Sequence, residues 1–213
     1  LSRETEDSDA WRSYTRAFIA EFAARGGEEY EATVRDLASS DNPDIAWRAR
    51  RALAARGLVD EAAIETWRSA DGSGEAARMS VEALASLPLQ DARSRAWESV
   101  YSESLSNDFL TATLAGLNAS SWDGDSGIEG AVDRLRSYWE SHTIGMSLRY
   151  ANGVLAYGLD IDRDGSVARS VGLLRGWLDA NGDAPAQLRR IVLEHLDAFE
   201  RDERVQRRWK QDQ

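Results

Sequence analysis

Three aspartates alternate in the stretch GLDIDRDGSVARSV, at Asp160, Asp162 and Asp164, and Gly165 follows them. An EF-hand calcium loop begins in this way, because its alternating carboxylates supply oxygen ligands and its glycine allows a sharp turn. The same loop ends on a bidentate glutamate at its twelfth position, which falls here on Val171. Val171 continues an apolar helical stripe, so we expect its side chain to be buried in the core.

A plainer role for these aspartates is to cap the helix that follows them. Asp162 or Asp164 would accept hydrogen bonds from the first N–H groups of that helix, since carboxylates stabilise helix N-termini. Gly158 or Gly165 would turn the chain. We therefore predict turn and cap residues here, and a weak cation site at Asp160, Asp162 and Asp164 stays the alternative.

The histidines do not form a zinc motif. A zinc peptidase needs His-Glu-x-x-His on one helix, whereas His142 and His195 are far apart and LEHL at 193–196 lacks a second histidine. His195 lies at the margin of an apolar stripe, which favours a packed structural histidine. The absence of cysteine excludes thiolate nucleophiles, disulfides and cysteine zinc sites.

Motifs for a nucleophile or a phosphate are also absent. The chain has no G-x-S-x-G elbow and no G-x-x-x-x-G-K loop. GDSGIEG at 124–130 is superficially similar to a serine-protease nucleophile loop, but we expect a loop in which Ser126 caps a helix starting at Ile128. We predict no catalytic, metal-binding or cofactor-binding residue in this chain.

Arginines are better candidates for recognition, because a guanidinium can hold a carboxylate through two hydrogen bonds. The seven that we single out are Arg50, Arg51, Arg93, Arg95, Arg149, Arg189 and Arg190. Large tryptophans are instead expected in the core, with each indole N–H reaching a partner. They are Trp47, Trp67, Trp97, Trp139 and Trp177.

The charge balance limits the partners of this chain. Its net charge is −11, whereas nucleic acids and anionic membranes attract basic surfaces. No apolar run approaches the roughly 18 residues of a membrane-spanning helix. We therefore expect no nucleic-acid partner and no membrane partner, and the lack of cysteine fits a reducing, cytoplasmic compartment.

Apolar residues recur at helical spacing along almost the whole chain, and strand-like alternation is hard to find. We predict an all-α fold, an α-α superhelix of HEAT-like antiparallel helix pairs, with about 10 or 11 helices in a single domain of residues 1–213. Four stripes mark helices: Trp11, Tyr14, Phe18 and Phe22; Ile45, Ala49, Ala52 and Leu53; Ile128, Ala131, Val132, Leu135 and Trp139; Leu188, Ile191, Val192, Leu196 and Phe199. The last stretch, from 184 to about 210, reads as one solvated helix with pairs at spacing four: Asp197/Arg201, Glu200/Arg204 and Glu203/Arg207.

The segment 42–100 resembles the C-terminal helical domain of aminopeptidase N, a family of zinc aminopeptidases, and its bacterial branch in particular. The positions that carry the resemblance are Trp47, Leu53, Gly57, Ile64, Asp71, Gly74, Pro88 and SRAW at 94–97. Later elements are similar as well: LSNDFLTATLAGL at 105–117, RSYWESHTIGMSLRYANGVL at 136–155 and QLRRIVLEHLDAFERDERVQ at 187–206. Leu117 and Met146 depart from the Phe and Trp of the family pattern, while Arg149 keeps the arginine position.

In that family the zinc site lies upstream, in a thermolysin-like domain with HExxH and GxMEN motifs, and neither motif occurs here. The resemblance implies that this chain is a non-catalytic domain that covers the active-site chamber. Its partners would be its own upstream catalytic domain and peptide substrates, and zinc would be a cofactor of the parent enzyme only. The start at Leu1 without a methionine fits an excised segment. The alternative function is a stand-alone HEAT-like scaffold that binds protein partners.

Overall fold

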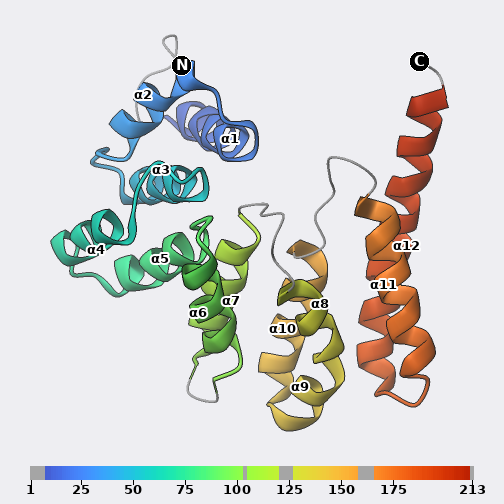
Figure 1. Cartoon of the computed structure of the whole chain (residues 1–213). Helices are drawn as coiled ribbons and strands as arrows, with labels where there is room; N and C mark the ends of the chain where they lie inside the picture. The colour runs from blue at the N-terminus through green and yellow to red at the C-terminus, as the bar shows by residue number, and fades with distance from the viewer. Residues whose placement is uncertain (1–7, 103–104, 120–126, 158–165, 212–213) are drawn as a thin grey trace. The chain divides into compact units, whose positions relative to one another are not determined.

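The computed structural model describes residues 8–102, 105–119, 127–157 and 166–211. Within these ranges the chain forms twelve α-helices and no strand, which confirms the all-α prediction (Figure 1). The third stripe was expected to form one helix, but a break at Arg134 divides it into α8 (Gly127–Asp133) and α9 (Leu135–Ser141). This break brings the helix count above the predicted number.

The chain divides into two compact units, Leu1–Trp122 and Asp123–Gln213, which we describe separately. The first unit contains α1 (Asp9–Arg25), α2 (Glu28–Leu37), α3 (Pro43–Ala55), α4 (Glu61–Ala70), α5 (Gly74–Ala85), α6 (Gln90–Val100) and α7 (Asn107–Leu117). Its odd-numbered helices pack in series, α1 on α3, α3 on α5 and α5 on α7, and each even-numbered helix packs on the odd one that follows it. Stacked helix pairs of this kind form an α-α superhelix.

The core of the first unit lies along α3. Its predicted stripe, Ile45, Ala49, Ala52 and Leu53, is fully buried. On α1 the predicted stripe is partly wrong, because Tyr14 is 62% exposed while Thr15 and Ile19 are buried. Two overlapping stripes on α1 satisfy the helical spacing, and α3 covers the one that carries Ile19.

Five of the seven helices described in this unit begin with a side-chain cap. Ser8, Asn42, Asp60, Ser73 and Ser106 each accept a hydrogen bond from an N–H in the first turn of their helix. After α3, Gly57 adopts φ +68°, and the N–H of Leu58 donates to the carbonyl of Leu53 at 2.9 Å. A side chain at Gly57 would be strained in this left-handed conformation, and its Cβ would lie 3.2 Å from Pro88.

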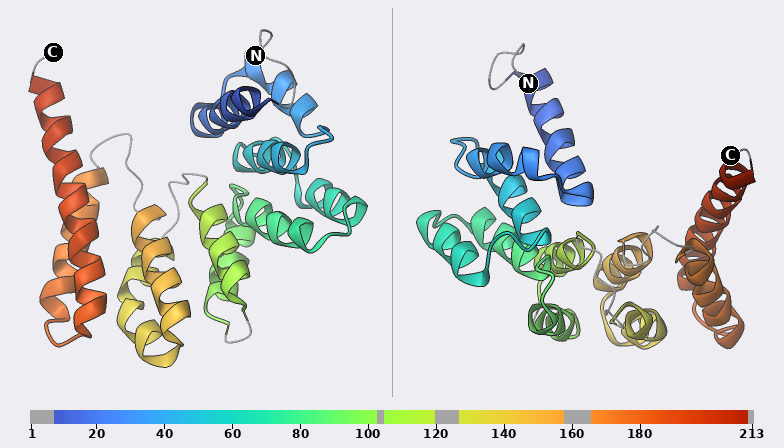
Figure 2. Two further views of the ribbon diagram at one scale, coloured as in Figure 1. Left: turned by 180° about the vertical axis from the view of Figure 1, so that it is seen from behind. Right: turned by 45° about the horizontal axis from the view of Figure 1, so that its top comes forward.

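The second unit contains α8, α9, α10 (Ile144–Tyr157), α11 (Ser166–Ala180) and α12 (Ala186–Gln211). Figure 2 shows α11 and α12 side by side, and α12 also packs on α10. The predicted stripe of α12, Leu188, Ile191, Val192, Leu196 and Phe199, is buried. Val167, Val171, Leu174 and Leu178 of α11 are buried too, which confirms the prediction that Val171 packs in the core.

Two of the three ion pairs predicted on α12 are present, Asp197 with Arg201 and Glu203 with Arg207, each at 2.5 Å. Glu200 was predicted to pair with Arg204, but it pairs at 2.6 Å with Arg175 of α11. In the part of the chain that the structure describes, no helix combines the length and the apolar character needed to cross a membrane.

Candidate functional site

The seven arginines that we expected to serve recognition all have partners within the chain. Three of them donate hydrogen bonds to carbonyl oxygens at helix C-termini: Arg50 to Ala38 at 2.9 Å, Arg93 to Leu117 at 2.9 Å, and Arg189 to Leu178 at 3.1 Å and Asn181 at 2.7 Å. The last carbonyls of a helix lack intrahelical donors and carry partial negative charge. These three arginines therefore stabilise helix ends.

The other four arginines are held by side chains or by their own helix. Arg51 of α3 reaches Glu82 of α5 at 2.5 Å, and Glu82 is only 7% exposed. The remaining partners are Glu61 for Arg95, the carbonyl of Gly145 for Arg149, and Glu194 for Arg190. The spacing of the seven arginines gave no sign of five of these contacts, because the partners lie on other helices or at their ends. The five are Arg50, Arg51, Arg93, Arg95 and Arg189.

A cluster of two indoles, one arginine and one aspartate occupies the first unit. The indole N–H of Trp47 donates to Asp71 at 3.1 Å, as expected for a buried tryptophan. This hydrogen bond is the main cause that lowers the pKa of Asp71. The guanidinium of Arg50 lies 4.9 Å from the ring centre of Trp47 and 5.4 Å from that of Trp67, and burial lowers its pKa. These polar groups find their partners within the first unit, so we interpret the cluster as part of the packing of that unit.

The histidines also have structural surroundings. His195 is half-buried on α12, and burial lowers its pKa. His142 stacks on Tyr138 with ring centres 3.8 Å apart, and its Nδ1 contacts the hydroxyl of Ser141 at 2.9 Å. Among the residues that the structure describes, no three His, Cys, Asp or Glu side chains gather as a metal site.

The loop residues singled out in the sequence are not described. Asp160, Asp162, Asp164, Gly158 and Gly165 lie outside the described residues, and so does Ser126. The capping role of the aspartates and the alternative cation site therefore stay predictions.

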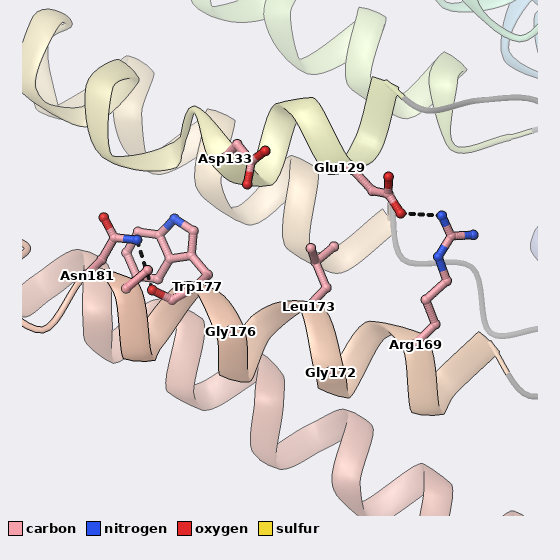
Figure 3. A pocket seen from close by; sticks show the side chains of 9 residues that line it. Glu129, Asp133, Arg169, Gly172, Leu173, Gly176, Trp177 and Asn181 are labelled. Carbon is pink, nitrogen blue, oxygen red and sulfur yellow. Dashed lines mark hydrogen bonds and ion pairs between the residues drawn. The ribbon is translucent and has the colours of Figure 1, made fainter.

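A pocket of about 430 Å³ lies between α8 and α11 in the second unit (Figure 3). It is lined by Glu129, Asp133, Arg169, Gly172, Leu173, Gly176, Trp177, Ala180 and Asn181. Glu129 and Asp133 project from α8 toward α11, while Leu173 and Trp177 project from α11 toward α8. This volume lies within the range of small-ligand sites, which are concave and largely apolar with a few polar groups.

The charges of the pocket are unequally satisfied. Glu129 and Arg169 form an ion pair across one end of the pocket. Asp133 is exposed, and no hydrogen bond or ion pair to another described residue engages its carboxylate. The two acids and one arginine leave the pocket with one uncompensated negative charge.

Trp177 is the unusual member of this pocket. Its side chain is 5% exposed, yet its Nε1 is buried without a hydrogen-bond partner among the described residues. We had expected this indole N–H to reach a partner, and that expectation is wrong for Trp177. Leaving a buried N–H unsatisfied costs about 1–3 kcal/mol, so the wall of the pocket holds an enclosed, unsatisfied donor.

Sequence reasoning missed this pocket because its residues come from two helices separated by a long interval in the chain. The signal that could have found it is the pair Gly172 and Gly176, four residues apart and therefore on one face of α11. A Cβ added at either glycine would meet no atom within 4 Å. The glycines thus open space beside the indole.

A comparison with known protein families finds no family model that matches this chain, and a comparison with curated proteins finds no significantly similar sequence.

Proposed function

We propose that this chain is the non-catalytic C-terminal helical domain of a zinc aminopeptidase of the aminopeptidase N type. In this role it covers the active-site chamber of a cytoplasmic parent enzyme and helps to restrict and position its peptide substrates. The parent enzyme removes N-terminal amino acids from peptides. Zinc and the reacting residues belong to an upstream catalytic domain, and this chain contributes no catalytic group.

The observation that carries the proposal is that residues matching the family pattern contact one another across helices. Trp47 of α3 donates its indole N–H to Asp71, which follows α4. Gly57, which follows α3, leaves room for Pro88, which precedes α6, because a Cβ at Gly57 would lie 3.2 Å from the proline ring. A set of positions that depend on one another for packing is what a shared fold would preserve, so these pairs support the resemblance on which the proposal rests.

The closing element of the resemblance supports it in the same way. In the sequence LRR, Leu188 is fully buried, Arg189 caps the end of α11, and Arg190 pairs with Glu194. Each residue of the triplet thus has a separate structural task.

The proposal is tested by comparing three proteins: this chain alone, the parent enzyme, and the parent enzyme without this chain. The isolated chain should not hydrolyse aminoacyl-arylamides even with added zinc. The parent should hydrolyse them in a chelator-sensitive reaction and should trim peptides but not folded proteins. Removal of the helical domain should weaken this discrimination, since the chamber would be open.

Two results would contradict the proposal. Chelator-sensitive turnover by the isolated chain would show a catalytic site in it. Equal trimming of peptides and folded proteins by the parent, with and without this domain, would show that the domain does not cover the chamber.

A second candidate function is a stand-alone scaffold for protein partners. The serial packing of α1, α3, α5 and α7 favours it, because superhelices of stacked helix pairs present extended binding surfaces. The two candidates differ in what precedes residue 1 in the gene. A scaffold needs no catalytic domain there, whereas the aminopeptidase proposal requires one.

A further inference from the structure

We propose that the pocket between α8 and α11 binds a basic side chain of a peptide, a lysine or arginine residue together with a main-chain carbonyl. This inference goes beyond the proposed function, which assigns no binding site in this chain. It rests on the pocket alone and is tested on this chain alone, so its failure would leave the aminopeptidase proposal standing.

The first requirement of the ligand is a positive charge. Asp133 lines the pocket with a carboxylate that no described residue engages, while Glu129 is already paired with Arg169. Asp133 is exposed, so it attracts a cation as a surface carboxylate does. One ammonium or guanidinium group would therefore balance the pocket, and a second anion would be repelled.

The second requirement is a hydrogen-bond acceptor. Trp177 presents an indole N–H without a partner from a side chain that is 5% exposed, and the nitrogen is on the edge of the ring that faces α8 (Figure 3). An anionic acceptor would lie near Asp133 and is disfavoured, so a neutral carbonyl oxygen fits better. Because the nitrogen is enclosed, the acceptor reaches it through a small rotation of the indole or of a lining side chain.

The third requirement is an apolar stem between the two polar groups. Leu173 and the indole face of Trp177 supply apolar surface, and Gly172 and Gly176 leave open space on the same face of α11. The methylene groups of lysine or arginine can cover such a surface while the charged end stays near water. A lysine or arginine residue in a peptide combines the stem, the cation and the carbonyl.

A simple alkylamine offers the stem and the cation but has no acceptor for Trp177. The whole protein also favours basic peptides, since its net charge of −11 raises their local concentration. The unsatisfied N–H is thus the feature that separates a peptide from a free amine as the occupant.

The test is a titration of this chain, labelled with nitrogen-15, with the blocked peptide acetyl-Ala-Lys-Ala-amide. The indole N–H resonance of Trp177 is identified by its loss in Trp177→Phe. The lysine peptide should shift this resonance in a saturable manner. Two comparison ligands follow: the same peptide with norleucine in place of lysine, which lacks the charge, and n-pentylammonium, which lacks the carbonyl. Both should bind at least about tenfold more weakly than the lysine peptide.

The matched variants are Asp133→Asn and Asp179→Asn. Both remove one exposed carboxylate from the α8 and α11 region, but Asp179 does not line the pocket. Asp133→Asn should weaken binding of the lysine peptide at least about tenfold, whereas Asp179→Asn should change it less than about twofold because Asp179 does not line the pocket and is exposed to solvent. Circular dichroism of both variants should match that of the parent chain.

The proposal is overturned if the lysine peptide does not bind, or if the norleucine peptide binds equally well. Equal losses in Asp133→Asn and Asp179→Asn would reduce the effect to net charge and would also overturn it. Two further results would contradict the proposed hydrogen bond between Trp177 and a peptide carbonyl. One is binding of the lysine peptide that does not shift the Trp177 resonance, and the other is binding of n-pentylammonium that is as tight as that of the lysine peptide.

Discussion

Gly116 of α7 lies directly against the backbone of α5. A Cβ added there would lie 2.2 Å from the carbonyl oxygen of Glu82 and 2.7 Å from the Cβ of Ala85, both on α5. Cβ atoms essentially never come closer than 3.0 Å to another heavy atom outside their own neighbourhood, so the backbone of α5 would have to retreat by 3.0 − 2.2 = 0.8 Å. We therefore predict that Gly116→Ala separates α5 from α7 and destabilises the protein.

The magnitude follows from two opposing effects. Replacing glycine by alanine inside a helix stabilises it by about 1 kcal/mol. Overpacking a closed interface costs about 1–3 kcal/mol and occasionally more, and a retreat of this size forfeits a substantial part of the dispersion contacts. The retreat would also disturb the ion pair between Glu82 and Arg51. We expect a net loss of about 1–2 kcal/mol in the free energy of unfolding.

The control is the same substitution at Gly176 of α11. A Cβ at this position meets no atom within 4 Å, so Gly176→Ala should stabilise the protein by about 0.5–1 kcal/mol. Urea unfolding followed by circular dichroism and tryptophan fluorescence measures both variants. The reasoning is refuted if Gly116→Ala is as stable as the parent chain, or if both substitutions shift stability in the same direction.

Three further predictions concern titratable residues and the aspartate loop. The hydrogen bond from Trp47 lowers the pKa of Asp71 below 3.8. The ionised Asp71 therefore stabilises the fold fully above that pH, and this stabilisation is lost as the pH falls through the lowered pKa. Acid unfolding of Asp71→Asn should show a weaker pH dependence than that of the parent chain, and an unchanged profile would contradict this. Burial lowers the pKa of His195 below 6.5, so the folded state takes up a proton less readily than the unfolded state. The free energy of unfolding should therefore fall as the pH drops from about 7 to 5. In His195→Gln this fall should be smaller, and an identical fall would exclude His195 as its source. Val171 is buried where a calcium loop needs its closing glutamate. Calorimetry should therefore detect no binding of calcium to this chain at micromolar concentrations. Calcium binding that is lost in Asp160→Asn and Asp162→Asn would contradict the capping interpretation.

Periodicity predicted most of the helices because an apolar stripe at helical spacing has one stable use in water, burial against another helix. It could not choose between two overlapping stripes on α1, since Tyr14 and Ile19 both fit the spacing and only α3 decides which is covered. Local capping signals were equally readable, as Asn42 and Gly57 show.

Side-chain partners across helices could not be read from the sequence. Glu200 has Arg204 four residues later, yet it pairs with Arg175 because α11 lies beside α12. The arginines that cap other helices and the pocket at Trp177 arise in the same way, from residues brought together by packing. A spacing of four residues identifies side chains that are neighbours on the same helix, but it does not show which residues of another helix they will contact.

The central proposal, that this chain belongs to a zinc aminopeptidase, is tested most directly by reading the gene upstream of the codon for Leu1. The proposal predicts an open reading frame that continues upstream for several hundred codons and encodes both HExxH with a later glutamate and a GxMEN segment. An upstream reading frame that encodes neither motif would contradict it and would leave the scaffold as the better account.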